Sequence, residues 1–303
     1  MSQRIAIVGG GLMGRGIAQV FACAGHAVRI TDPHAEARSQ IVSRIAANLD
    51  ELGGDRAALA QIEIADSLAA CVTDADWVIE AAPEDLELKQ KIFAEVEQAA
   101  PRQAILASNT SVIPISKITA RVEHKDRALG THWWNPPYLV PLVEVIRTAE
   151  TSDSSVAAAM ALLKSLGKSP VEVKKDAPGF IGNRLQHALW REAIALVAEG
   201  VCDAKTVDDV VKLSFGARLA VLGPLENADL VGLDLTRSIH TFVFPALDRA
   251  VAPSPYLVKL IEEGRLGFKS KGGFRDWPLD AQAAVRTKLT EHLKASFGAP
   301  ARE

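Results

Sequence analysis

Short apolar runs alternate with amphipathic stretches over the first 177 residues of the chain. The runs have the length and the β-branched content of strands, and they lie at residues 4–8, 26–31, 76–80, 104–107, 140–146 and 170–173. Between them, apolar residues recur at helical spacing at residues 13–25, 87–99 and 153–166. This alternation predicts an α/β domain built on a doubly wound, mostly parallel sheet.

The pattern changes to helices after Pro178. Helical spacing continues through residues 180–198, stops at Gly200, and returns at 204–213 and 233–250. We therefore expect two domains, a sheet domain at 1–177 and an all-helical C-terminal domain at 178–303. A helical domain this apolar commonly closes a cleft and makes a dimer contact. The last dozen residues are expected to be a frayed helix end.

A glycine-rich turn joins the first strand to the first helix. Gly9, Gly11 and Gly14 have the spacing of a dinucleotide-binding motif, and Leu12 and Met13 open the helix. The first glycine permits the tight turn, the second lets the backbone approach a pyrophosphate, and the third lets helix and strand pack closely. The pyrophosphate would lie at the helix N-terminus, which favours an anion. The turn predicts a Rossmann-type domain.

Asp32 ends the second predicted strand, eighteen residues after Gly14. A carboxylate at this place accepts hydrogen bonds from the adenosine ribose hydroxyls and repels a 2′-phosphate. NAD is therefore the expected cofactor, in preference to NADP. The alternative role for Asp32 is a helix N-cap before Pro33.

His132 and Glu144 are ionisable residues in otherwise apolar surroundings, on either side of the Pro136-Pro137 turn. An ionised glutamate in a buried strand needs a partner, because its desolvation costs several kcal/mol. A carboxylate that holds one imidazole nitrogen leaves the other free to move a substrate proton. The alternative is a satisfied core histidine, with Glu144 paired to a surface arginine.

Composition is that of an ordinary globular enzyme, with 303 residues, 48% hydrophobic and 23% charged. The net charge of −3 offers no basic surface for nucleic acid. No apolar run is long enough to span a membrane, and the first strand begins too early for a signal peptide, so cytoplasmic residence is expected. Cys23, Cys71 and Cys202 lack metal-ligand spacing and are expected to be unbridged thiols, and no metal is expected.

Over nearly its whole length the chain resembles the L-3-hydroxyacyl-CoA dehydrogenase family. The motifs that carry the resemblance are Gly9 to Gly14, Asp32, Glu80-Ala-Ala-Pro-Glu84-Asp-Leu-Glu-Leu-Lys89, Ser108-Asn-Thr-Ser111, His132-Trp-Trp-Asn135-Pro, Glu144 and Asp176-Ala-Pro-Gly-Phe-Ile-Gly-Asn183-Arg. Together they are highly specific. The resemblance implies an NAD-dependent dehydrogenase that acts on a CH–OH group and transfers a hydride reversibly.

The resemblance also implies roles for single residues. His132 would be the catalytic acid/base and Glu144 its orienting carboxylate, and Ser111 and Asn183 would hydrogen-bond the substrate oxygens. The nicotinamide half of the cofactor site would be lined by Glu84, Lys89 and Asn135. Each role has a structural alternative: Ser111 could cap the turn near Ile113, and Glu84 and Lys89 could form a solvated pair. Asn183 is a poor helix former, which favours a functional position.

The substrate class rests on charge. Residues 33–61 contain no lysine, only Arg38, Arg44 and Arg56 among four acidic residues, which suits the phosphates of CoA poorly. Pro141 stands where acyl-CoA members commonly carry lysine. Both features favour the free-acid branch of the family, which includes L-gulonate 3-dehydrogenase (lambda-crystallin), carnitine dehydrogenase and a pyridine-carboxylate dehydrogenase of vitamin B6 breakdown.

We therefore expect a small 3-hydroxy acid or related alcohol as the substrate. Arg184, beside Asn183, is a candidate to meet a substrate carboxylate, and an interdomain ion pair is its equal alternative. A 3-hydroxyacyl-CoA substrate is the runner-up. A third interpretation is a non-catalytic NAD-binding protein, crystallin-like or a sensor, because fold does not fix function.

Overall fold

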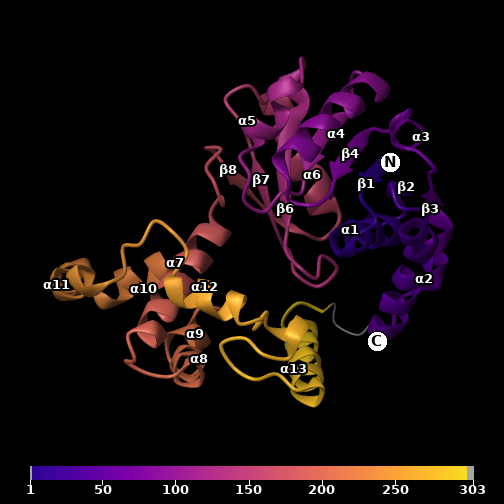
Figure 1. The fold of residues 1–303 in the computed structure, drawn as a ribbon. Helices are drawn as coiled ribbons and strands as arrows, with labels where there is room; N and C mark the ends of the chain where they lie inside the picture. The colour runs from indigo at the N-terminus through magenta and orange to yellow at the C-terminus, as the bar shows by residue number, and fades with distance from the viewer. Residues whose placement is uncertain (1, 299–303) are drawn as a thin grey trace. The chain divides into compact units, whose positions relative to one another are not determined.

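The computed structural model describes residues 2–298, and an eight-stranded sheet forms the core of the N-terminal part (Figure 1). The strand order is β3-β2-β1-β4-β5-β6-β7-β8, and only the β6 and β7 neighbours run antiparallel. The strands are β1 Arg4–Val8, β2 Ala27–Thr31, β3 Ile62–Ile64, β4 Trp77–Glu80, β5 Ile105–Ser108, β6 Ala128–Trp133, β7 Leu142–Ile146 and β8 Ser169–Val173. The doubly wound, mostly parallel sheet predicted from the sequence is confirmed.

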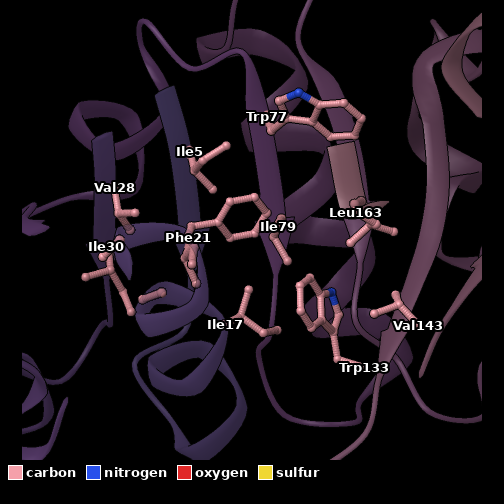
Figure 2. Close-up of a cluster of buried hydrophobic side chains, with 14 of the residues drawn as sticks. Ile5, Ile17, Phe21, Val28, Ile30, Trp77, Ile79, Trp133, Val143 and Leu163 are labelled. Carbon is pink, nitrogen blue, oxygen red and sulfur yellow. The ribbon is translucent and has the colours of Figure 1, made fainter. Parts of the chain in front are cut away.

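Helices cover both faces of this sheet because successive strand residues point to opposite sides. Ile5 and Ile7 of β1 join one buried cluster, drawn in Figure 2, whereas Ala6 and Val8 join a second. Trp133 at the end of β6 packs in the first cluster, only 2% exposed. The covering helices are α1 Leu12–Cys23, α2 Ala35–Leu52, α3 Leu68–Val72, α4 Leu86–Ala99, α5 Ile115–Ile118 and α6 Asp153–Ser165.

The C-terminal part is helical, as predicted. Its helices are α7 Gly182–Ala198, α8 Ala204–Leu213, α9 Phe215–Arg218, α10 Pro224–Val231, α11 Leu233–Val243, α12 Pro255–Glu262 and α13 Leu279–Phe297. The helix expected at 233–250 ends early, because Pro245 lacks an amide hydrogen and the chain tightens into the 3-10 helix Phe244–Ala246. Of the frayed end expected for the last dozen residues, 299–303 lie outside the described range.

The described residues form two compact units, one of residues 2–184 and 292–298 and the other of Leu185–Glu291. The first unit therefore extends past Pro178 to Arg184. Hydrogen bonds explain this: the amide of Gly179 donates to the carbonyl oxygen of Val112 at 3.2 Å, and the amides of Ile181 (2.9 Å) and Gly182 (3.1 Å) donate to the Glu144 carboxylate. None of the helices within residues 2–298 is both long and apolar enough to cross a membrane.

Candidate active site

The turn between β1 and α1 has the close contacts that its glycines predict. Gly9 has a φ of +115°, and a Cβ there would lie 2.6 Å from the carbonyl oxygen of Ala81. A Cβ on Gly14 would lie 1.9 Å from the carbonyl oxygen of Gly9. Gly11 differs, because a Cβ there would meet no atom within 4 Å. The first and third glycines thus allow the chain to pack, whereas the second faces open space where a pyrophosphate fits.

The N-terminus of α1 is suited to an anion. No side chain caps it, and its first turn holds no acidic residue. Leu12 is 57% exposed in this turn, and Met13 packs against the first core cluster. The amide groups of the first turn are therefore available to a phosphate. The residues present fit the pyrophosphate of NAD.

Asp32 follows β2 and faces the glycine turn. Its Oδ2 accepts a hydrogen bond from the backbone amide of Gly10 at 2.9 Å, and its Oδ1 accepts from the amide of His34 at 3.0 Å. The N-cap of α2 is His34, so Asp32 is not the cap of that helix. Its carboxylate is held at the carboxyl end of the sheet, where a dinucleotide's ribose would lie.

His132 and Glu144 lie directly opposite each other in the antiparallel pair of β6 and β7. The imidazole Nδ1 is 2.7 Å from the carboxylate Oε2, and the two residues are 3% and 1% exposed. Within residues 2–298, Glu144 makes no ion pair with an arginine, so that alternative is wrong. The second ring nitrogen, Nε2, makes no hydrogen bond to any described residue.

The second oxygen of Glu144 lies at the beginning of α7. Oε1 accepts hydrogen bonds from the backbone amides of Ile181 (2.9 Å) and Gly182 (3.1 Å). Burial acts to raise the pKa of Glu144, but hydrogen bonds from His132 and these two amides outweigh it and hold the pKa below its ordinary value. Glu144 is therefore an ionised carboxylate with both oxygens engaged.

Ser111 and Asn183 lie together although 72 residues separate them, since the Asn183 Nδ2 donates to the carbonyl oxygen of Ser111 at 2.8 Å. The amide of Ile113 bonds to the Thr110 hydroxyl at 3.1 Å, so Thr110 caps the turn and the alternative role for Ser111 is wrong. In the described part of the chain the Ser111 hydroxyl makes no hydrogen bond. It is therefore available to a ligand.

Glu84 and Lys89 are not a solvated pair. Lys89 is 1% exposed, and its Nζ lies 2.7 Å from Oε1 of Glu80 and 3.6 Å from Oε2 of Glu84. Glu84 Oε1 accepts from the backbone amides of Ser111 and Val112, both at 3.1 Å. Lys89 is thus enclosed, and Glu84 holds the loop that carries Ser111. Sequence reasoning gave Glu80 no role, although a carboxylate at the end of an apolar strand was a signal.

Asn135 is exposed and lies in the loop after β6. This loop packs on α1, because a Cβ on Gly16 would lie 2.6 Å from the Pro137 ring. Lys168 also holds the loop: its Nζ donates to the carbonyl oxygens of Pro137 and, at 3.0 Å, Val140. Burial lowers the pKa of Lys168 to about 8. Sequence reasoning missed Lys168, and no local pattern marks it.

The chain matches two family models along most of its length. Residues 4–177 match the NAD binding domain of 3-hydroxyacyl-CoA dehydrogenase, and residues 179–277 match the C-terminal domain of the same enzyme. The chain belongs to the 3-hydroxyacyl-CoA dehydrogenase family. It is an NAD-dependent dehydrogenase of the class that acts on CH–OH groups.

Among its relatives, 5-formyl-3-hydroxy-2-methylpyridine 4-carboxylate 5-dehydrogenase of Mesorhizobium japonicum is 34% identical, with 97% of each chain covered. A solved structure of an enzyme of that name, described as an NAD+-dependent dismutase, has a TM-score of 0.90 at 33% identity and 97% coverage of each chain. A probable 3-hydroxybutyryl-CoA dehydrogenase of Bacillus subtilis is 38% identical over 91% of this chain and 97% of its own length. L-carnitine dehydrogenase of Nocardiopsis dassonvillei is 38% identical over 75% of this chain and 70% of its own length.

Proposed function

We propose that His132 is the acid/base of a reversible oxidation of a secondary alcohol and that Glu144 orients it. The observation that carries this proposal is the buried 2.7 Å contact between Nδ1 and Oε2, which leaves Nε2 without a partner among the described residues. NAD, when bound, accepts the hydride at C4 of its nicotinamide. Neutral His132 takes the hydroxyl proton at Nε2, and Glu144 stabilises the imidazolium through Nδ1.

Ser111 and Asn183 position the substrate in this proposal. The Ser111 hydroxyl donates to a substrate oxygen, and Asn183, tied to the Ser111 carbonyl at 2.8 Å, fixes where the hydroxyl lies. Glu84 and Asn135 line the nicotinamide half of the cofactor site. Lys89 holds Glu84 in place for that half of the site, because its buried ammonium lies between Glu80 and Glu84.

The substrate we propose is a small 3-hydroxy acid with a free carboxylate. Each arginine of residues 33–61 already has a partner: Arg38 donates to the Asp32 carbonyl at 2.7 Å, Arg44 to Gln40, and Arg56 to Asp50 at 2.5 Å. These guanidinium groups are held within the chain, and the four acidic residues of the segment outnumber them, so residues 33–61 carry no net positive charge for the phosphates of CoA. The relatives named for pyridine-carboxylate and carnitine act on substrates without CoA, which supports the same choice.

Arg184 is the cation we assign to the substrate carboxylate. It is exposed, follows Asn183 directly, and forms no ion pair within residues 2–298. Its guanidinium could bind a carboxylate through two parallel hydrogen bonds.

A 3-hydroxyacyl-CoA is the second candidate substrate, supported by the 38% identity to the probable 3-hydroxybutyryl-CoA dehydrogenase. A non-catalytic NAD-binding role is disfavoured, because a binding module has no need of a buried acid/base pair.

We also propose a cytoplasmic homodimer formed through the helical domain. This domain carries large apolar side chains in solvent, among them Leu213 at 85%, Val221 at 83%, Leu225 at 80% and Phe242 at 81% exposure. Exposed apolar residues in this number are typical of a subunit interface. Light scattering of the purified protein measures the oligomeric state.

The experiment that tests the proposed function is NADH production on a panel of substrates. The panel contains 3-hydroxybutyrate, gulonate, carnitine, a pyridine-carboxylate aldehyde and 3-hydroxybutyryl-CoA, each assayed with the wild type and with His132→Gln. Turnover of a free acid that depends on His132 supports the proposal. Turnover that survives in His132→Gln, or no turnover of any substrate while NAD binds, contradicts it.

A further inference from the structure

The turn before α7 contains a bulky residue in a backbone conformation that bulky residues avoid. Phe180 has a φ of +51°, and it directly follows Gly179 with a φ of +75°. An L-residue in this left-handed region brings its Cβ close to the following carbonyl, so the conformation persists only where the surroundings impose it. Within residues 2–298, Lys271 is the only other non-glycine residue with a positive φ.

The two left-handed residues turn the chain so that the next two amides point the same way. Those amides, of Ile181 and Gly182, both donate to Oε1 of Glu144, at 2.9 and 3.1 Å. Successive amides that converge after a left-handed turn form a small anion-binding concavity. Here the anion is the protein's own carboxylate, which binds His132 with its other oxygen.

Packing on both sides holds the turn in place. Phe180 is 2% exposed, and its ring centroid lies 5.7 Å from that of His132. The amide of Gly179 donates to the carbonyl oxygen of Val112 at 3.2 Å. A Cβ on Gly182 would lie 2.4 Å from Cζ2 of Trp134, so only glycine fits there. The strained conformation is thus fixed by its neighbours and lies beside the acid/base pair, where stored strain commonly serves a function.

The geometry points to Phe180 as a positioning residue of the reaction, whose left-handed backbone holds the Glu144 carboxylate so that His132 is an effective base. This inference rests on the proposed role of His132. With both oxygens engaged, the carboxylate keeps its negative charge against Nδ1 and stabilises the imidazolium. If the turn relaxes, Oε1 loses the two donors that fix the carboxylate against Nδ1, and the displaced carboxylate supports the imidazolium less.

Four variants separate the backbone conformation from the phenyl ring. Phe180→Val keeps an apolar side chain but excludes the left-handed region, because valine is β-branched. Phe180→Gly keeps that region and removes the ring. Gly179→Ala strains the same turn, and its new Cβ meets nothing closer than Arg184 Cγ at 3.4 Å. The matched control is Gly25→Ala, at a φ of +80° with nothing within 4 Å of the new Cβ.

Two measurements report how readily His132 takes up a proton. One is the pH midpoint of kcat/KM for alcohol oxidation, and the other is the NMR titration midpoint of the imidazole in histidine-labelled protein. In Phe180→Val and Gly179→Ala we expect both midpoints to move down by about one pH unit, a tenfold change in proton affinity. In Gly25→Ala we expect both to stay at the wild-type value, and in Phe180→Gly we expect a smaller shift than in Phe180→Val, because the turn is kept and only the ring beside His132 is lost.

A shift of the same size in Phe180→Gly and Phe180→Val would overturn the inference, because the ring and not the backbone would then be responsible. Unshifted midpoints in Gly179→Ala would also overturn it, and this variant decides the matter if the Phe180 variants do not fold. The NMR readout needs no turnover. If the wild type oxidises nothing on the panel while the NMR midpoint moves as expected, the proposed function fails and the positioning role of Phe180 stands.

Discussion

His132 of β6 faces Glu144 of β7 across an antiparallel strand pair, and their side chains meet at 2.7 Å in the buried interior. The neighbouring residue of each strand, Trp133 and Val143 respectively, points to the other face and packs in the first core cluster. The same alternation that builds the core therefore brings His132 and Glu144 together. Because both strands belong to the central sheet, the pair is rigidly held.

Replacing His132 tests its proposed role most directly. In His132→Gln we expect kcat to fall by at least about 100-fold, the range for loss of a general base, with the Kd for NAD nearly unchanged. Steady-state kinetics and NAD titration by fluorescence measure the two quantities. Wild-type turnover in the variant would remove His132 from the mechanism.

Glu144 should make stability depend on pH at the acid end. Its pKa in the folded protein lies below the ordinary value of 4.5, because hydrogen bonds from His132 and two backbone amides outweigh burial. Such a group contributes stability above its unfolded pKa, and the contribution is lost as pH falls through the folded pKa. The wild type should therefore lose more unfolding free energy than Glu144→Gln between about pH 6 and about pH 3.5.

Denaturant unfolding at a series of pH values measures this difference. Glu95→Gln is the matched control, because Glu95 is a half-exposed carboxylate whose nearest cation, Lys91, is 4.0 Å away. It should keep the pH dependence of the wild type. Parallel curves for the wild type and Glu144→Gln would mean that the ionised carboxylate does not stabilise the fold.

Asp32 should control the choice between NAD and NADP. In Asp32→Ala we expect weaker NAD binding and a narrower advantage over NADP, since a hydrogen bond to ribose and a repulsion toward the 2′-phosphate both disappear. The cofactor KM values on both forms measure the effect. Glu36→Ala removes the same charge from an exposed site in the first turn of α2 and should leave the ratio unchanged. An unaltered ratio in Asp32→Ala would place the ribose elsewhere.

Local patterns predicted the parts of the site that local geometry fixes. The glycine spacing predicted the turn after β1, because a Cβ on Gly9 or Gly14 would collide with a carbonyl oxygen, and β1 has the predicted bounds, Arg4–Val8. The pairing of His132 with Glu144 was also within reach, because a short turn between two apolar segments returns the chain on itself. The burial of Lys89 could not be predicted, because a lysine in an amphipathic helix is expected on the exposed face. Its partner Glu80 lies on a separate strand, β4.

Long-range contacts set the features that the sequence did not reveal. The strand expected at 140–146 begins at Leu142, and Lys168 of a distant loop binds the Val140 carbonyl just before it. The left-handed Phe180 was equally hidden, because nothing in its own residue type favours that conformation and only packing imposes it. Sequence reasoning thus selected the candidate site residues, and tertiary contacts determine how they are held.

The substrate class gives the last prediction. Because the arginines of residues 33–61 are engaged within the chain and Arg184 has no ion pair among residues 2–298, we expect a higher kcat/KM for a free hydroxy acid than for 3-hydroxybutyryl-CoA. Arg184→Gln should lower kcat/KM for the free acid by about tenfold or more, roughly 1.4 kcal/mol of transition-state binding. The same variant should not change kcat/KM for an alcohol without a carboxylate, because that substrate has no negative charge to pair with Arg184. Equal losses of kcat/KM on both substrates would assign Arg184 a structural role. If kcat/KM for a CoA thioester exceeds that for every free acid by more than about tenfold, the protein is a 3-hydroxyacyl-CoA dehydrogenase of this family and the free-acid proposal is wrong.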